Sequence, residues 1–291
     1  MPDLPRASIL VPVYNAATTL EECITSLLAL DYPRDLLELI FVDNASTDAT
    51  RDVLRRYHGK LKILFEAKRG PAAARNKGLQ HARGEMIAFT DSDCVVDKAW
   101  LKNIVAPLED KTVGIAGGKI LAKPPASEIE RFGEQIHDHS KAIEEYKPPY
   151  VITMNWASRL SVLQEAGLFD EILLRAEDVD LSYRIFQRGY KIVYQPEAVI
   201  YHANEKTYSG LFQEGYLHGV ASVQALKKHA ALAARYGHRR VNLGSYRQIF
   251  SEFAVVFRGE AGQEKRCSLF FNLGKKAGKL VGSLRFAYLD L

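Results

Sequence analysis

The chain has 291 residues, of which 47% are hydrophobic and 25% charged, a composition typical of a folded protein and unlike that of a disordered one. No apolar run approaches the roughly 20 residues that cross a bilayer, so an integral membrane protein is not expected. The three cysteines lie far apart without a Cys-x-x-Cys pair, which favours a reducing, cytoplasmic setting. The amino terminus has no export-signal pattern.

The formal net charge is +4, and residues 258–291 alone carry seven Lys or Arg against three acidic residues. The rest of the chain is balanced, and no nucleic-acid partner is expected.

Strand and helix patterns alternate through the first hundred residues. Short apolar runs predict strands at residues 7–13, 37–42, 62–65 and 86–90. Helical spacing or helix-start signals follow the first three runs, and Pro71 suits the first turn of the third helix. This alternation predicts an α/β fold with a parallel, Rossmann-like sheet and helices on both faces. Residues 1–100 are therefore expected to form a nucleotide-binding half.

The later residues predict a second half and a helical extension. Further strands are expected at residues 113–118, 151–156, 192–194 and 199–202, and helices at 127–146 and 177–188. From Tyr208 onward the pattern is helical. We therefore expect a catalytic domain at 1–205, with an acceptor-binding half at 101–205, and a helical extension at 206–291.

Polar residues follow three of the predicted strands. Pro12, Val13, Tyr14 and Asn15 end the first strand, Asp43 ends the second, and Asp91-Ser92-Asp93 ends the fourth. Ligands of open α/β sheets bind at this carboxyl edge. Two aspartates separated by a small residue can reach the same hard cation or a sugar phosphate beside it. The sequence therefore predicts a site for a metal-bound diphosphate.

Two other residues at this edge have alternative interpretations. Asp43 can accept a proton from a nucleotide base, or it can close a turn within Asp43-Asn-Ala-Ser-Thr-Asp48. Arg69 precedes the helix that begins near Pro71, where it adds positive charge at a helix end that already favours anions.

Seven short motifs, in order and spacing, resemble family 2 glycosyltransferases. They are Pro12-Val-Tyr-Asn15, Val42-Asp-Asn-Ala-Ser-Thr-Asp48, Arg69-Gly-Pro-Ala-Ala-Ala-Arg-Asn76, Asp91-Ser-Asp93, Gly167-Leu-Phe-Asp-Glu171, Glu177-Asp-Val-Asp-Leu181 and Val199-Ile-Tyr-His202. The resemblance covers about residues 7–205. It implies an inverting enzyme with the GT-A fold, a mostly parallel central sheet with helices on both faces.

The resemblance also implies roles for the residues at the sheet edge. The donor nucleotide would lie across Pro12–Asn15, Asp43 and Arg69, with Asp91 and Ser92 near ribose or metal. Asp93 would bind Mg2+ or Mn2+, and Asp178 would be the catalytic base. His202 is either a further metal ligand or a neutral histidine packed at a strand end.

On the acceptor side, the resemblance points to Asn155, Trp156 and Glu177. Trp156 can stack on a sugar ring or belong to the core. Glu177 can orient the acceptor or raise the pKa of Asp178, or it can serve as a favourable charge in the first turn of a helix. The family often has glycine where this chain has Thr153, a departure that is expected to narrow the pocket.

The C-terminal helices have two interpretations. One apolar stripe contains Phe250, Phe253, Ala254 and Phe257, and another contains Leu273, Ala277, Leu280 and Leu284. Basic residues are available to the opposite faces: Lys275, Lys276, Lys279 and Arg285. These helices can pack on the catalytic domain. Alternatively, a basic face can meet anionic lipid at the inner face of the membrane and bring the enzyme to a lipid-linked acceptor.

The leading hypothesis is transfer of a single sugar from a UDP-linked donor to a hydroxyl acceptor in cell-surface glycan or polysaccharide synthesis. The Gln-x-x-Arg-Trp signature of processive synthases is absent from the sequence. A sugar nucleotidyltransferase would need a glycine-rich phosphate loop after the first strand, and a dehydrogenase would need Gly-x-Gly-x-x-Gly. The sequence has neither motif, which disfavours both classes of enzyme. A non-catalytic nucleotide-sugar-binding protein is the alternative from another class.

Overall fold

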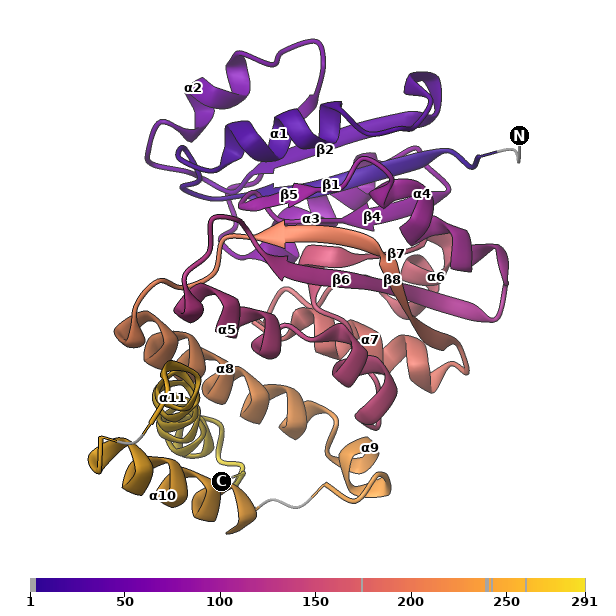
Figure 1. The fold of residues 1–291 in the computed structure, drawn as a ribbon. Coiled ribbons are helices and arrows are strands. Elements are labelled where there is room, and N and C mark those ends of the chain that lie inside the picture. The colour runs from indigo at the N-terminus through magenta and orange to yellow at the C-terminus, as the bar shows by residue number, and fades with distance from the viewer. Residues whose placement is uncertain (1–3, 174, 239–240, 242, 260, 291) are drawn as a thin grey trace. The chain divides into compact units, whose positions relative to one another are not determined.

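The computed structural model describes residues 4–173, 175–238, 241, 243–259 and 261–290 (Figure 1). The chain forms two compact units. The first consists of Met1–Lys123 and Asp138–His202, and the second consists of Pro124–His137 and Ala203–Leu291. Residues 124–137, which lie in sequence between the two segments of the first unit, therefore belong to the second unit. We call the two units the sheet unit and the helical unit.

One eight-stranded sheet organises the sheet unit. Its strands are β1 (Ala7–Val13), β2 (Leu37–Asp43), β3 (Lys62–Phe65), β4 (Met86–Phe89), β5 (Cys94–Val96), β6 (Val113–Ala122), β7 (Trp156–Arg159) and β8 (Lys191–His202). Their order is β3-β2-β1-β4-β7-β6-β8-β5. Strands β1 to β4 are parallel, as are β6 and β8, whereas β7 and β5 run antiparallel to their neighbours. The predicted mostly parallel α/β sheet is confirmed.

The predictions differ from the structure at three strands. The strand expected at residues 151–156 begins only at Trp156, and the two short strands at 192–194 and 199–202 are one strand, β8. A register shift between β6 and β8 at Gly118 and Lys119 interrupts this strand's pattern. β5 was not predicted, because its three residues are too few to show the hydrophobic periodicity of a strand.

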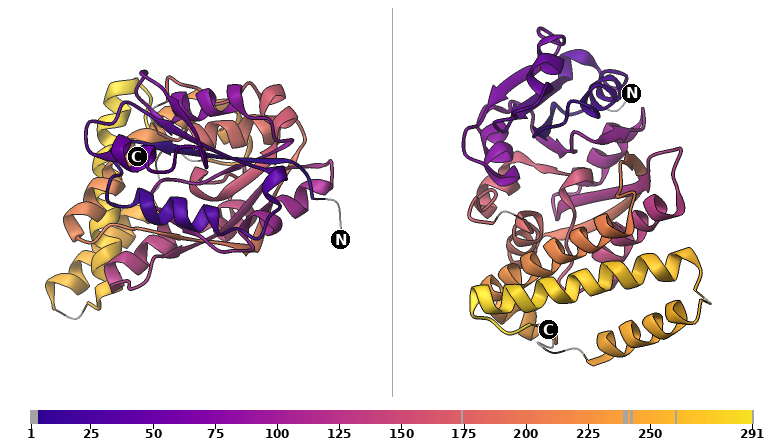
Figure 2. Two further views of the ribbon diagram at one scale, coloured as in Figure 1. Left: turned by 90° about the horizontal axis from the view of Figure 1, so that it is seen from above. Right: turned by 90° about the vertical axis from the view of Figure 1, so that its left-hand side faces the viewer.

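Helices cover both faces of the sheet (Figures 1 and 2). They are α1 (Leu20–Leu28), α2 (Thr50–Arg55), α3 (Pro71–His81), α4 (Trp100–Val105), α6 (Leu160–Ala166) and α7 (Glu177–Gln187), with a π-helical turn at Lys141–Glu145. The side chains of β1 alternate between two cores. Ile9 and Val11 pack with α1 and α4, whereas Leu10 packs with α3, α6 and α7. Burial of apolar surface on both faces supplies the main stabilising free energy of the unit.

The helical unit contains α5 (Glu128–Ile136), α8 (Tyr208–Lys228), α9 (Ala230–Arg235), α10 (Leu243–Phe257) and α11 (Gln263–Phe286). A capping box at Ser127 and Glu130 starts α5. Among the described residues, none of these helices combines the length and the apolar character that a bilayer crossing requires. The single polar helix predicted at 127–146 is thus divided between α5 and the π-helical turn.

Glycines bring α8 and α11 together at very short range. A Cβ atom at Gly278 would overlap the carbonyl oxygen of Tyr216, and one at Gly219 would overlap that of Lys275. Gly215 and Gly274 make equivalent backbone approaches, and Gly282 makes a looser contact with Val220 and Val223. The glycine side of α11 is therefore the one that packs on α8.

This packing corrects the sequence interpretation of α11. The expected apolar stripe is exposed: Leu280 and Leu284 are 53% and 78% accessible. Conversely, Lys279 is largely buried in an ion pair with Asp290, with 2.7 Å between Nζ and Oδ2. Burial and the charge of Lys279 lower the pKa of Lys275. Two of the lysines expected on a solvent face are thus inside the unit, because glycine permits an approach that leucine would prevent.

Candidate functional site

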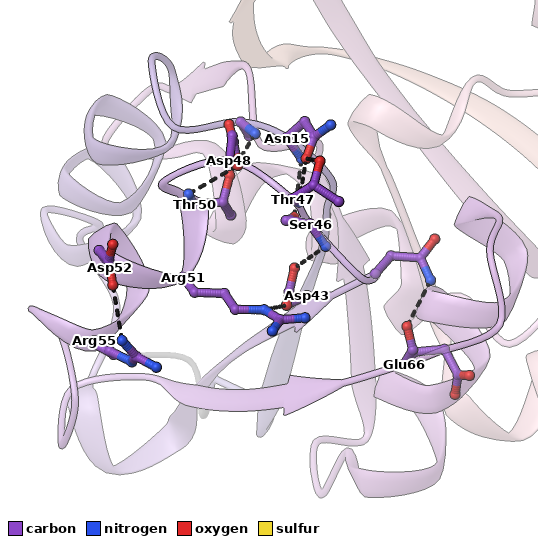
Figure 3. A network of polar contacts seen from close by, with 12 residues as sticks. Asn15, Asp43, Ser46, Thr47, Asp48, Thr50, Arg51, Asp52, Arg55 and Glu66 are labelled. Atoms are coloured by element: carbon purple, nitrogen blue, oxygen red, sulfur yellow. Dashed lines mark hydrogen bonds and ion pairs between the residues drawn. The ribbon is translucent and has the colours of Figure 1, made fainter.

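The loops after β1 and β2 form one hydrogen-bonded network at the carboxyl edge of the sheet (Figure 3). Asn15 has a left-handed backbone, with φ of 48°. Its N–H donates to Ser46 Oγ over 3.1 Å, and its Oδ1 accepts from the N–H of Thr47 over 2.8 Å. Asp48 accepts from Ala17 and from Thr50. The loop carrying Tyr14 and Asn15 is therefore fixed by the polar motif that follows β2.

Asp43 ends β2 directly opposite Val13 of β1. Its Oδ1 accepts from the N–H of Ser46 at 3.0 Å, and its Oδ2 contacts Arg51 Nε at 2.7 Å (Figure 3). The turn-closing interaction is thus present. The Asp43 side chain is 5% exposed, whereas Arg51 is 49% exposed, so a ligand group that displaces Arg51 could reach Oδ2.

Arg69 and Tyr14 form a cation–π pair at this edge. The Arg69 guanidinium carbon lies 3.8 Å from the centre of the Tyr14 ring, and Tyr14 is 44% exposed. Asn44 holds the loop behind them, because its Oδ1 accepts from the N–H of Gly70 and its amide donates to the carbonyl of Lys68. Gly70 has φ of 127°, which glycine adopts without strain, and Pro71 then starts α3.

Arg75 joins two acidic segments that lie 86 residues apart in the sequence. Its Nη2 donates to Asp91 Oδ1 over 2.9 Å, and its Nη1 donates to Glu177 Oε1 over 2.5 Å. The Arg75 side chain is 4% exposed and that of Glu177 is 7% exposed. Burial raises the pKa of Glu177 to about 7, with a further increase from the charge of Asp178 and an opposing decrease from Arg75. Burial likewise raises the pKa of Asp91 in spite of Arg75.

Arg75 was not predicted as a site residue, although it lies within one of the recognised motifs. The available signal was a basic residue in an otherwise alanine-rich helical stretch. Next to it, Asn76 donates to the carbonyl oxygen of Phe169 and accepts from its N–H, which fixes the loop before α7.

Asp93 and His202 meet because β5 pairs antiparallel with the end of β8, where Cys94 lies opposite His202. The distance from His202 Nε2 to Asp93 Oδ2 is 3.5 Å. Burial tends to raise the pKa of Asp93, but contact with His202 and its charge lower it overall. Carboxylate and imidazole donors at this spacing fit a shared divalent cation such as Mn2+.

Cys94 also has a ligand atom in this cluster. Its thiol is fully buried, and burial together with the charges of Asp93 and Asp91 raises its pKa well above the ordinary value. Because the thiolate is the form that binds metals, Cys94 is poorly suited as a ligand beside Asp93 and His202.

Asp178 is the second residue of α7, after Glu177, and is held by Thr153. The N–H and hydroxyl of Thr153 both donate to Asp178 Oδ2, over 3.1 and 3.0 Å. Asp178 Oδ1 accepts from the N–H of Val179. Thr153, which was expected to narrow the pocket, orients the carboxylate of Asp178.

Asn155 and Trp156 lie in the core of the sheet unit, and both are 0% exposed. Asn155 accepts from the Trp100 indole over 2.7 Å and donates to the carbonyls of Lys119 and Ala198. Trp156 stacks on Phe89 with 4.6 Å between ring centres. In this structure their contacts are those of core residues, and neither side chain is available to an acceptor.

The structure thus arranges the expected residues in three groups. Tyr14, Asn15, Asp43 and Arg69 line the edge formed by β1 and β2, with Pro12 and the buried Val13 in β1 itself. Asp91 and Glu177 share Arg75, which places Asp178 next to the segment after β4. Asp93 and His202 form the third group, and Ser92 is half-buried between Asp91 and Asp93.

Residues 8–166 match the model of glycosyl transferase family 2, which is more than half of the chain. The chain belongs to this family. Among curated members, glycosyltransferase AglE of Haloferax volcanii is 29% identical over 202 residues, covering 67% of this chain and 66% of AglE. The poly(ribitol-phosphate) beta-N-acetylglucosaminyltransferase TarS of Staphylococcus aureus is 26% identical over 217 residues, covering 69% of this chain and 36% of TarS. The aligned regions thus represent less than two thirds of these relatives' length.

Solved structures of glycosyltransferases share the fold. Mannosyltransferase PcManGT from Pyrobaculum calidifontis, in complex with GDP-Man and Mn2+, has a TM-score of 0.67 at 24% identity, covering 97% of this chain and 88% of that one. TarS 1-349 in complex with UDP-GlcNAc has a TM-score of 0.58 at 19% identity, covering 97% of this chain and 92% of that one. The predicted family and GT-A fold class are therefore confirmed.

Proposed function

We propose that this protein is a metal-dependent, inverting glycosyltransferase that moves one sugar from a nucleoside-diphosphate sugar to a hydroxyl acceptor in glycan or polysaccharide synthesis. The observation that carries the proposal is the Arg75 bridge, which connects Asp91 at the sheet edge with Glu177 beside Asp178. The ion pairs of Arg75 connect the sheet edge with Glu177, so Asp178 lies next to this ionic network without being bound by Arg75. Membership of the family supports the reaction class.

In the proposed reaction, Asp178 accepts the proton of the acceptor hydroxyl while that oxygen bonds to the anomeric carbon and the bond to the diphosphate breaks. Thr153 fixes Oδ2 of Asp178 and so limits the carboxylate to a narrow set of orientations. Asp93 and His202 would hold Mg2+ or Mn2+, and the ion would neutralise the charge that develops on the leaving diphosphate. Attack opposite the leaving group inverts the anomeric centre.

The variant Asp178→Asn tests the proposed base, with Asp52→Asn as the matched control because Asp52 is 73% exposed in a surface ion pair with Arg55. Asp178→Asn is expected to lower transfer by a factor of about 100 or more, as for loss of a general base, while donor binding stays nearly unchanged. Transfer, release of free nucleotide and donor Kd should be measured in parallel. Full transfer by Asp178→Asn would remove the assigned role.

We propose UDP as the donor nucleotide. One structural neighbour binds GDP-Man and another binds UDP-GlcNAc, so the fold accommodates either base. Thermal unfolding with UDP or GDP, each with Mn2+ or Mg2+, shows which nucleotide binds, because selective binding to the native state raises Tm. A larger shift with GDP than with UDP would reassign the donor.

We also propose that the helical unit makes peripheral contact with anionic membrane at the cytoplasmic face. Three phenylalanines of α10 are exposed, namely Phe250, Phe253 and Phe257, at 72, 55 and 83%. They recur at helical spacing and therefore share one side of α10. Arg258, Lys265 and Arg266 are exposed where α10 leads into α11, which lies alongside it (Figure 2). An apolar stripe next to basic residues suits an anionic lipid surface and would bring the enzyme to a lipid-linked acceptor.

Sedimentation with vesicles that contain anionic lipid tests this contact. Replacing the three phenylalanines by serine is expected to weaken binding at least about tenfold, since each buried phenylalanine contributes about 1.5–3 kcal/mol. Ile172→Ser, which removes an exposed apolar side chain of the sheet unit, is the control. Equal sedimentation of wild type and the triple variant would refute the proposal without affecting the proposed sugar transfer.

A further inference from the structure

A second cluster of metal-ligating side chains lies entirely within the helical unit. It consists of His137 at the C-terminal end of α5 and Glu214 and His218 of α8. Glu214 and His218 are four residues apart and so share one face of α8. From these three residues we propose a binding site for a divalent transition metal of the zinc class. The site does not depend on the proposed sugar transfer.

The distances fit one ion. Glu214 Oε1 lies 3.2 Å from His137 Nε2 and 3.9 Å from His218 Nε2. Donors bound tetrahedrally at roughly 2.1 Å are separated by about 3.4 Å, a value between the two observed distances. The same carboxylate oxygen makes both contacts, so a single cation can bind all three residues after a small side-chain adjustment.

The donor chemistry favours zinc over magnesium or calcium. Two imidazoles and one carboxylate form a common zinc donor set, whereas hard cations prefer oxygen ligands throughout. Two neutral imidazoles and a carboxylate would leave a net charge of +1 with a divalent ion. Three protein ligands leave a fourth position for water or an anionic group.

The surroundings are built to hold these side chains. His137 is 4% exposed, and the side chain of Glu214 is 15% exposed. The ring of His218 lies edge-on to Phe271, with 5.8 Å between ring centres, and Phe271 packs in turn against Phe132 of α5. An apolar wall on one side excludes water and strengthens electrostatic interactions at the cluster. A bound ion would therefore fasten the end of α5 to α8.

The site can be tested with the full chain after removal of metal by a chelator. Zn2+ binding is measured by calorimetry, and Co2+ is used as a spectroscopic probe of the ligand geometry. The variants Glu214→Gln and His218→Ala remove one ligand each. Asp93→Asn removes a ligand of the other candidate site, and His58→Ala removes an exposed histidine elsewhere.

We expect one equivalent of Zn2+ at this cluster, and both Asp93→Asn and His58→Ala should retain it. Glu214→Gln and His218→Ala should bind it at least about 100-fold more weakly, since even indirect supporting residues change metal affinity by 10 to 100-fold. Zn2+ should also raise Tm of the wild type and of Asp93→Asn, but not of the two ligand variants. Circular dichroism verifies that His218→Ala, whose side chain is 36% exposed in the wild type, remains folded. Equal affinity and stoichiometry in the wild type and Glu214→Gln would overturn the proposal.

Discussion

Replacing Arg75 by methionine is expected to destabilise the protein by about 3–5 kcal/mol at pH 8, the cost of leaving a buried charge without its partner. Arg75 and Glu177 are 4% and 7% exposed, so water compensates little for the loss. Asp91 is 29% exposed, and its share of the cost is reduced by solvent. Methionine has similar length and no charge, so the change removes the ion pairs with little loss of volume.

The destabilisation by Arg75→Met should be smaller at pH 5, because Glu177 is then protonated in the folded protein. Its folded-state pKa is raised, so between about pH 4.5 and 7 the folded protein holds a proton that the unfolded chain has released. Stability therefore falls as pH rises through this window. Loss of Arg75 removes the largest effect that lowers the pKa of Glu177, and the fall in stability should become steeper.

Urea unfolding at pH 5 and pH 8 measures both effects. Arg55→Met is the control, since Arg55 is 77% exposed and its pair with Asp52 should contribute at most about 1 kcal/mol. The double variant Arg75→Met/Glu177→Gln should recover part of the stability, because the buried carboxylate is gone. A loss below about 1 kcal/mol for Arg75→Met, equal at both pH values, would refute this account of the site.

Three other predictions concern single contacts. Thr153→Val removes the hydroxyl that holds Asp178 and should lower kcat about tenfold, matching about 1.5 kcal/mol, with donor Kd unchanged by calorimetry. Gly278→Ala should destabilise by about 2 kcal/mol or more in urea unfolding because its Cβ would overlap α8. Gly262→Ala, which has open space around it but replaces the N-cap of α11, should cost about 1 kcal/mol or less. A stabilised Gly278→Ala would mean that helix propensity outweighs the overlap. Glu177→Gln should flatten the fall in Tm between pH 5 and pH 8, and an unchanged slope would assign that fall to another group.

The repeated strand–helix units of the first hundred residues could be predicted from the sequence, because each strand is an apolar run and helical spacing or a helix-start signal follows the first three runs. The Asp91-Ser92-Asp93 position after β4 followed from the same pattern. β5 could not be predicted, since its pairing with β8 involves residues about 100 positions apart. Across the same distance in sequence, only the family resemblance suggested that His202 lies near a metal held by Asp93, and the contact between them is seen in the fold.

The packing of α11 shows another limit of sequence patterns. Hydrophobic periodicity selects the leucine stripe as the buried face, because transfer of leucine from water is favourable. In the structure, close backbone contact through Gly274 and Gly278 decides which face packs on α8, and Leu280 and Leu284 are exposed. A helix pair at such short range gains dispersion energy along its whole length, a term that a single-residue hydrophobicity scale does not contain.

The Arg75 bridge also separates residues that look equivalent in the sequence. Asp91 and Asp93 form one acidic pair, and Glu177 and Asp178 form another. In each pair one member binds Arg75, whereas the other contacts a neutral or titratable group: Asp93 meets His202 and Asp178 meets Thr153. An acid bound to a buried guanidinium is held in place and poorly available to a ligand, so the unbridged members are the better candidates for cation binding and proton transfer. One buried arginine thereby fixes two acids as supports and leaves Asp93 and Asp178 for the proposed chemistry.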